Sequence, residues 1–262
     1  MLKKRLIACL LLKDGQLVES IGFNQFLMIG NAVMAVRHFN AWAIDEIVFL
    51  DINREKKYDF WRNDVHYDNT LGNFTEVIKY ISKSCFVPLT AGGGIRSVDD
   101  MRNYIHAGAD KIAINTVALE NPEIITDGAR IFGSQCIVVS IDAKKFPDGA
   151  HHVMKGFGQI DTGLTAVGWA KEIEKRGAGE IFLTSIDQDG SQKGYDAELI
   201  RTVASAVNIP VIASGGVGDW KHLVEGISAG ASAVSVGNKF HFTEHSTMHA
   251  KKYLQQHGVD VR

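Results

Sequence analysis

Residues 87–95 read VPLTAGGGI and residues 209–217 read IPVIASGGV, so one strand-like stretch with a glycine turn occurs twice in the chain. The tripeptide Ala-Gly-Ala at 107–109 recurs at 229–231, again 122 residues later. A separation that stays constant through a strand, a helix and the next strand indicates an internal repeat. The sequence therefore predicts two related halves with pseudo-twofold symmetry.

Short runs rich in β-branched and aliphatic residues alternate with amphipathic stretches, among them Val98–Ala107, Ala166–Arg176 and Ala197–Ala206. Such alternation is typical of parallel strands joined by right-handed helical crossovers. The expected strands are Arg5–Leu10, Glu46–Asp51, Val87–Ala91, Lys111–Asn115, Cys136–Asp142, Glu180–Ser185, Pro210–Ser214 and Ala233–Val236. Eight such units without a linker predict an α/β protein, with one (β/α)8 TIM barrel spanning residues 1–262.

The composition excludes several classes of function. A formal net charge of −2 gives no general attraction for nucleic acid or for an anionic membrane, so we expect a small ligand. The apolar run Leu6–Leu12 is too short to span a bilayer. Cys9, Cys85 and Cys136 are odd in number and far apart, which favours a reduced, cytoplasmic protein. No cofactor is expected.

In each half of the chain, one expected strand ends in a pair of glycines, and the next expected strand ends in small polar residues. In a barrel these ends meet at the C-terminal face, where glycine lets the backbone approach an anion and N–H groups bind it. The alternative is that the glycines only make tight turns. Two cradles suit a small molecule with a phosphate at each end. The predicted phosphate-binding residues are Gly93, Gly94, Asn115, Thr116, Gly215, Gly216, Gly237 and Asn238.

Three aspartates end expected strands, where polar side chains of a barrel point toward the active site. For Asp51 we favour a structural role, binding the loop that follows it. Asp142 and Asp187 lie beside small residues that leave room for a substrate. We therefore predict Asp142 and Asp187 as the acid–base residues.

Five motifs together resemble the cyclase subunit of imidazole glycerol phosphate synthase, and the match runs from Met1 to Arg262. They are AGGGIRS at 91–97, GADKIAINT at 108–116, FGSQCIVVSIDAK at 132–144, GAGEIFLTSID at 177–187 and GVDVR at 258–262. The resemblance implies that a glutaminase docks on the N-terminal face of the barrel. Ammonia would then pass through the barrel to a two-phosphate substrate, which is cleaved and cyclised at the other end.

One catalytic position departs from that family. The family has two acid–base aspartates, one ending the first strand and one ending the fifth, and Asp142 matches the second. The first should stand in the motif CLDVKDG, but residues 9–15 read CLLLKDG, with Leu11 at the carboxylate position. An aliphatic side chain cannot transfer a proton. A lysine of the family just beyond is also missing, and Glu19 near its place would repel a phosphorylated substrate.

A segment at 53–69 is about a dozen residues longer than expected of the family and contains Tyr58, Phe60, Trp61 and Tyr67. Long loops of compact domains are often functional, and aromatic residues are unusual in disordered ones. The segment could cover the active face, dock another protein, or pack on the rim of the barrel. The sequence leaves all three open.

The resemblance also implies an ammonia gate at the N-terminal face, made of Arg5, Glu46, Lys111 and Glu180. These residues begin the first, second, fourth and sixth strands, so they converge where the barrel opens. The alternative is an ordinary stabilising cluster, since bottom-face residues generally serve stability. His241, His245 and His249 are spaced by four, but no metal site is expected because no further ligand completes one.

Three functions remain open. The first is an ammonia conduit that, with a glutaminase and a separate sugar amidotransferase, supports acetamidino formation on a bacterial surface sugar, as in divergent cyclase-like paralogues. The second is a cyclase and lyase of histidine biosynthesis, in which Asp187 or Glu19 replaces the lost aspartate. The third is a phosphate-binding scaffold without ammonia flux.

Overall fold

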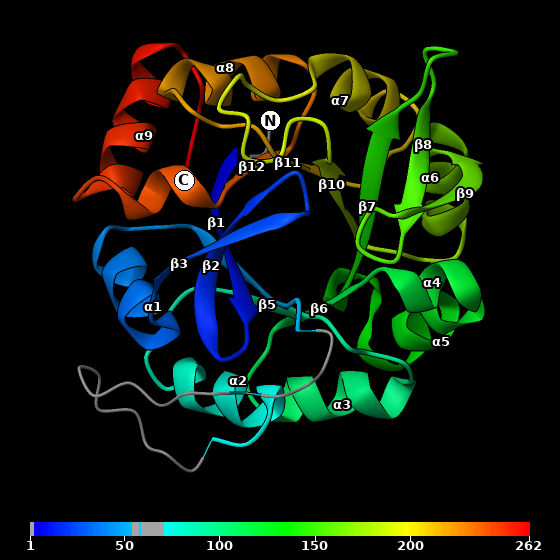
Figure 1. Ribbon diagram of the computed structural model, residues 1–262, viewed down its shortest axis with the longest axis horizontal. Coiled ribbons are helices and arrows are strands. Elements are labelled where there is room, and N and C mark those ends of the chain that lie inside the picture. Colours follow the sequence, from blue (N-terminus) through cyan, green and yellow to red (C-terminus); the bar gives the residue numbers. More distant parts are fainter. Residues whose placement is uncertain (1–2, 54–57, 59–70) are drawn as a thin grey trace.

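A closed barrel of eight parallel strands forms the centre of the computed structural model, which describes residues 3–53, 58 and 71–262 (Figure 1). The barrel strands are β1 (Arg5–Lys13), β4 (Glu46–Asp51), β5 (Leu89–Gly92), β6 (Lys111–Ile114), β7 (Ile137–Lys145), β10 (Glu180–Ser185), β11 (Val211–Ser214) and β12 (Ala233–Val236). They pair in this order, and β12 pairs back with β1. The predicted (β/α)8 barrel is confirmed.

Helices form the outer ring in Figure 1 and cover the outward faces of the strands. They are α1 (Ala32–Ala41), α2 (Phe74–Ser82), α3 (Val98–His106), α4 (Thr116–Glu120), α5 (Glu123–Phe132), α6 (Ala166–Lys175), α7 (Ala197–Ala204), α8 (Trp220–Ser228) and α9 (Ser246–Gln256). Helix α3 begins at a capping box, in which the Ser97 hydroxyl accepts the Asp100 N–H and the Asp100 carboxylate accepts the Ser97 N–H. The described residues also form 3-10 turns at Ser134–Cys136 and Asn238–His241.

Side chains alternate along each strand between the helix layer and the barrel interior. On β1, Leu6 and Leu10 pack in the large core beneath the helices, whereas Ile7 packs inside the barrel. The interior layer consists of Ile7, Val48, Ala113, Val138, Phe182, Ile212 and Ala233. The middle of the barrel is therefore an apolar layer that separates its two polar ends.

Two antiparallel hairpins, which were not predicted, extend the barrel at equivalent places in the two halves. They are β2 (Gln16–Ile21) with β3 (Gln25–Gly30), and β8 (His151–Lys155) with β9 (Ile160–Thr165). β2 pairs with the end of β1, and β8 pairs with the end of β7. The first turn has Asp14 and Gly15 at φ 51° and 85°. These two residues join β1 to β2, and Asp-Gly is a strong signal for a two-residue turn between antiparallel strands, so the pairing of β1 with β2 could have been found from the sequence.

In the described part of the chain, no helix combines the length and apolar character that crossing a membrane would require. Cys9, Cys85 and Cys136 are all free thiols. Except for Asn53 and Tyr58, the aromatic segment at 53–69 lies outside the described residues.

The contact between barrel and helix layer gives a stability prediction. Phe49 on β4 is fully buried and its ring lies 5.1 Å from that of Phe74 on α2. Phe49→Ala should lower the free energy of unfolding by about 3–5 kcal/mol, because it leaves a cavity between the layers. Phe86→Ala is the matched control, since that ring is 84% exposed and its loss should cost less than about 0.5 kcal/mol. Urea unfolding measures both, and equal effects would contradict this account of the core.

Candidate functional site

A cavity of about 1040 Å³ lies at the C-terminal ends of the barrel strands. Strand ends form its floor, and residues of both hairpins, including Phe23 and Phe26 of the first and Phe157 and Ile160 of the second, form part of its wall. In Figure 1 the β2–β3 hairpin crosses the middle of the barrel. All eight predicted phosphate-binding residues line this one cavity: Gly93, Gly94, Asn115, Thr116, Gly215, Gly216, Gly237 and Asn238.

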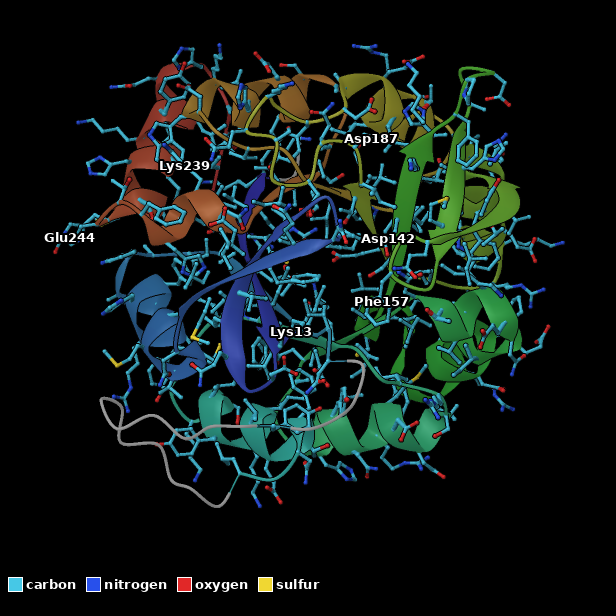
Figure 2. All side chains as sticks on the ribbon, in the orientation of Figure 1. Lys13, Asp142, Phe157, Asp187, Lys239 and Glu244 are labelled. Carbon is cyan, nitrogen blue, oxygen red and sulfur yellow. The ribbon has the colours of Figure 1, made fainter. Side chains whose placement is uncertain are left out.

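Asp142 lies near the end of β7 and faces this cavity, closer to the centre of the barrel than Asp187 (Figure 2). Its Oδ2 accepts a hydrogen bond from Asn115 Nδ2 at 2.7 Å. Burial raises the pKa of the Asp142 carboxyl to about 7; the Asn115 hydrogen bond lowers this pKa and the charge of Asp189 raises it. A carboxyl with a pKa near 7 can give and take protons at neutral pH, as acid–base work requires.

The corner of the cavity at β1 contains aliphatic side chains. Leu11 lines the cavity beside Leu50 of β4, its partner in the sheet, and Val18 of β2. Glu19 is buried, and it lies between Val18 and Ser20, which both face the cavity. Because side chains alternate along a strand, Glu19 points to the other side of β2. The expectation that Glu19 faces a substrate is therefore not met, and β1 and β2 bring no carboxylate to this corner.

The loop after β10 brings a different aspartate to the cavity than the one predicted. Asp187 is exposed and lies outside the cavity lining, where its Oδ2 accepts the N–H of Lys145 at 2.8 Å. Asp189 lines the cavity instead, because the chain turns after Ser185, whose carbonyl accepts the Asp189 N–H at 3.1 Å. Strand-end position alone could not indicate this turn.

Asp189 also binds the first hairpin to the second half of the barrel. Its Oδ2 accepts hydrogen bonds from the Ser20 hydroxyl at 2.6 Å and from the Phe23 N–H at 3.2 Å, and its carbonyl accepts the Gly22 N–H. Burial raises the pKa of the Asp189 carboxyl, the hydrogen bonds from Ser20, Phe23 and Gly22 lower it, and the charge of Glu19 raises it further. The hairpin position over the cavity therefore depends on this residue.

The glycine pairs adopt backbone conformations that other residues rarely take. Gly93 and Gly94 have φ of 101° and 68°, and Gly215 and Gly216 have φ of 92° and 104°. A Cβ on Gly93 would lie 2.0 Å from the Asp51 carbonyl oxygen, and one on Gly216 would lie 2.1 Å from that of Gly194. Close packing of the protein backbone alone thus requires glycine at two of these positions.

The cavity also offers polar groups for a ligand. The Oδ1 atom of Asn115 is buried and has no hydrogen-bond partner among the described residues. The Nδ2 of Asn238 donates to the Ser20 carbonyl at 3.2 Å. Arg96, just after the first glycine pair, is the one Lys or Arg among the lining residues that the structure describes. The cavity can therefore offer a guanidinium and backbone donors to an anion at the first cradle.

Four charged side chains form a closed ring at the opposite end of the barrel. Arg5 contacts Glu46 at 2.7 Å and Glu180 at 2.9 Å, and Lys111 contacts the same two carboxylates at 2.9 and 3.1 Å. The Thr90 hydroxyl also donates to Glu46 at 3.1 Å. Burial lowers the pKa of Arg5, but the attraction of Glu180 and Glu46 outweighs it, so the pKa is raised overall. The sequence thus identified four residues that do meet.

Asp51 binds the loop that follows it, as predicted. Its Oδ1 accepts the Asn53 N–H at 3.0 Å, and its Oδ2 accepts a hydrogen bond from the Tyr58 hydroxyl at 2.5 Å. Asp51 also lines the cavity. Tyr58, the one described residue between 54 and 70, therefore contacts a residue of the cavity.

The three spaced histidines do not share a helix. His241 ends a 3-10 turn and packs on Phe39, whereas His245 precedes α9 and packs on Trp42. In residues 3–53, 58 and 71–262, no group of three or more His, Cys, Asp or Glu side chains could bind a metal ion.

Comparison with known proteins assigns the family. Residues 5–246 match the family model described as "Histidine biosynthesis protein". Imidazole glycerol phosphate synthase subunit HisF of Natranaerobius thermophilus is 45% identical over the full length of both chains, and that of Streptococcus mutans is 42% identical over the full length of both. The subunit HisF of Wolinella succinogenes is 42% identical over this whole chain and 98% of its own. The chain therefore belongs to the histidine biosynthesis protein family and, within it, to the HisF family.

Proposed function

We propose that this chain is the ammonia-accepting subunit of a glutamine-dependent enzyme and transfers nitrogen to a phosphorylated acceptor in the cavity. The observation that carries the proposal is the arrangement of the barrel's two ends. A ring of alternating charges closes one end, and the cavity with two glycine cradles lies at the other. A glutaminase subunit docking at the ring would deliver ammonia along the barrel axis. The names of the relatives, each a subunit of a synthase, support a partner chain.

Phosphate binding at the cradles rests on the lining of the cavity. Both glycine pairs face it, and Arg96 and Asn115 lie beside the first pair. Backbone N–H groups freed by glycine conformations bind anions without needing a cationic side chain. The number of cradles favours an acceptor with two phosphate groups, or one phosphate and a second anionic group.

Two acceptors are candidates, and different observations favour them. The names of the relatives favour the histidine-pathway reaction of imidazole glycerol phosphate synthase over sugar amidation. Leu11 favours the other candidate, in which the chain supplies ammonia for amidation of a bacterial surface sugar by a separate amidotransferase. Among the described residues, β1 and β2 bring no carboxylate to the cavity, so the two-carboxylate chemistry implied by the resemblance would have to pair Asp142 with Asp51, Glu120 or Asp189. Asp51 is bound by Asn53 and Tyr58. Asp189 is engaged with the first hairpin, which favours the changed chemistry.

The charge ring gives the first functional prediction. Lys111→Ala removes one of the two cations that bridge Glu46 and Glu180, so Arg5 alone compensates two carboxylates, and their repulsion should loosen the ring. In the reconstituted complex, we expect glutamine-dependent turnover to fall by about tenfold while turnover with added ammonium changes by less than about twofold, because only channelled ammonia uses the ring. Steady-state assays with each nitrogen source measure this.

Lys251→Ala is the matched control for the ring. Lys251 is also largely buried and forms an ion pair with Asp45 at 2.5 Å, outside the ring. Lys251→Ala should reduce stability, and it should change glutamine-dependent turnover and ammonium-dependent turnover by the same factor. If Lys111→Ala lowers both activities equally, or lowers neither, the ring is a structural cluster and the conduit proposal fails.

Leu11 gives a prediction that separates the acceptors. A lost general acid or base costs about 10²–10⁴-fold in rate, so the chain should cyclise the histidine-pathway intermediate at least about 10²-fold more slowly than the HisF subunit of Natranaerobius thermophilus. Its gene should likewise fail to restore growth without histidine to a strain lacking the cyclase subunit, while the gene of that relative restores it. Turnover within about tenfold of the relative would establish the histidine-pathway function and exclude the sugar acceptor.

Asp142 gives a prediction of pH dependence. Its folded-state pKa is raised from 3.8 to about 7, so the native state keeps a proton that the unfolded chain has lost. Stability from this group is present below pH 3.8 and is lost as the pH rises through 7. Asp142→Asn cannot ionise, so it should be more stable relative to wild type at pH 8 than at pH 5, by on the order of 1–4 kcal/mol. Urea unfolding at both pH values tests this, and a pH-independent difference would refute the raised pKa.

A further inference from the structure

The two glycine cradles differ in how their peptide groups are fixed. At the first, the Tyr104 hydroxyl of α3 donates a hydrogen bond to the Gly93 carbonyl at 2.8 Å. Helix α3 lies outside the barrel, so this carbonyl points away from the cavity. The peptide bond is trans, which puts the following N–H, that of Gly94, on the opposite side. The Gly94 N–H therefore points into the cavity that Gly94 lines.

A second tyrosine, Tyr58, contacts Asp51, the residue whose backbone packs on Gly93. The Asp51 carbonyl oxygen packs so closely on Gly93 that an added Cβ would lie 2.0 Å from it. Among the described residues, the Asn53 N–H at 3.0 Å and the Tyr58 hydroxyl at 2.5 Å donate to the Asp51 carboxylate. Burial raises the pKa values of Tyr58 and Tyr104, so both hydroxyls remain protonated donors at neutral pH. Tyr58 thus supports the backbone on which Gly93 packs.

Within residues 3–53, 58 and 71–262, no such pair of tyrosines fixes the second cradle. The residue 122 positions after Tyr104 is Gly226, and the Tyr195 ring fills the space there, because an added Cβ would lie 2.8 Å from its Cδ2. The Tyr195 hydroxyl donates to the Ser235 carbonyl at 2.8 Å and not to the glycine turn. In the peptide that follows the equivalent one, the Gly216 carbonyl accepts the Gly194 N–H at 2.8 Å. Main-chain contact therefore fixes the second turn.

We infer that Tyr104, and Tyr58 through Asp51, are positioning residues of the first phosphate cradle, which orient the Gly94 N–H toward a bound phosphate group. The second cradle is independent of both hydroxyls. This inference rests on the proposed function, in which the cavity binds phosphate groups. It assigns a role to Tyr58 at the beginning of the long aromatic segment, and it makes the two ends of a two-phosphate acceptor chemically unequal.

The test measures each cradle separately. Protein labelled with ¹⁵N-glycine is titrated with inorganic phosphate, and the amide signals of Gly94 and Gly216 report the two cradles. Tyr104→Phe keeps the ring, which packs at 5.4 Å on Phe74, and removes the donor. We expect the Kd at Gly94 to rise by about tenfold, as loss of one hydrogen bond in a buried network implies. The Kd at Gly216 should stay within about twofold of wild type, because its own turn is untouched.

Tyr58→Phe acts one contact further away, and we expect it to raise the Kd at Gly94 by about threefold. Tyr195→Phe is the matched control, because Tyr195 is 9% exposed like Tyr104 and its hydroxyl also donates to a carbonyl at 2.8 Å. It should leave the Kd at Gly94 unchanged. A merely structural loss would weaken both cradles together, so the ratio of the two Kd values identifies positioning.

The outcomes separate the inference from the proposed function. If wild-type protein shows no phosphate-dependent shift at Gly94 or Gly216, phosphate binding itself is wrong. If wild type binds phosphate but Tyr104→Phe and Tyr58→Phe leave the ratio of the two Kd values unchanged, the positioning role is overturned. Should Tyr104→Phe fail to fold, Tyr58→Phe decides alone, and a Kd at Gly94 equal to that of wild type then overturns the role.

Discussion

Pairing of β10 with β7 closes the barrel, and the rest of the structure depends on that closure. Once the sheet is closed, every second side chain of each strand points inside and stacks in layers. Along β1 the inward residues are Arg5, Ile7, Cys9 and Leu11. Arg5 therefore belongs to the charge ring and Ile7 to the apolar middle layer. Cys9 and Leu11 belong to the floor and to the β1 corner of the cavity, respectively. One hydrogen-bonded closure thus separates the end with the charge ring from the end with the cavity.

The apolar middle layer explains how opposite chemistries coexist in one barrel. Buried charges need partners, and at the ring each cation has two carboxylates within 3.1 Å. At the other end, burial without a cation raises the pKa values of Asp142 and Asp189. The first arrangement neutralises charge by pairing, and the second favours carboxyls that can carry a proton. The apolar layer of Ile7, Val48, Ala113, Val138, Phe182, Ile212 and Ala233 lies between them, so the charges of one end are kept apart from the carboxyls of the other.

The internal repeat sets equivalent positions, but the two halves use them differently. Both first strands continue into a hairpin, yet the matching cavity positions hold Leu11 in one half and Asp142 in the other. The same holds at the glycine turns, where Tyr104 and Gly226 are equivalent residues. Asp189 then connects the halves by binding the hairpin of the first. The asymmetry lies in side chains and loops, and the backbone of the strands keeps the repeat.

The sequence by itself determined the eight strands, the repeat and the convergence of Arg5, Glu46, Lys111 and Glu180. The strands follow from the two-residue alternation of side chains along a strand. The convergence follows from the order of the strands, because parallel pairing of successive strands places their first residues at the same end of the barrel. Only the tertiary structure decided that Asp189 rather than Asp187 faces the cavity and that Glu19 points away from it. It alone also brought Tyr58 and Tyr104 to the first glycine turn. Loops have no period, and Ser20 and Asp189 meet across 169 residues of chain, so such contacts depend on the path of the whole fold.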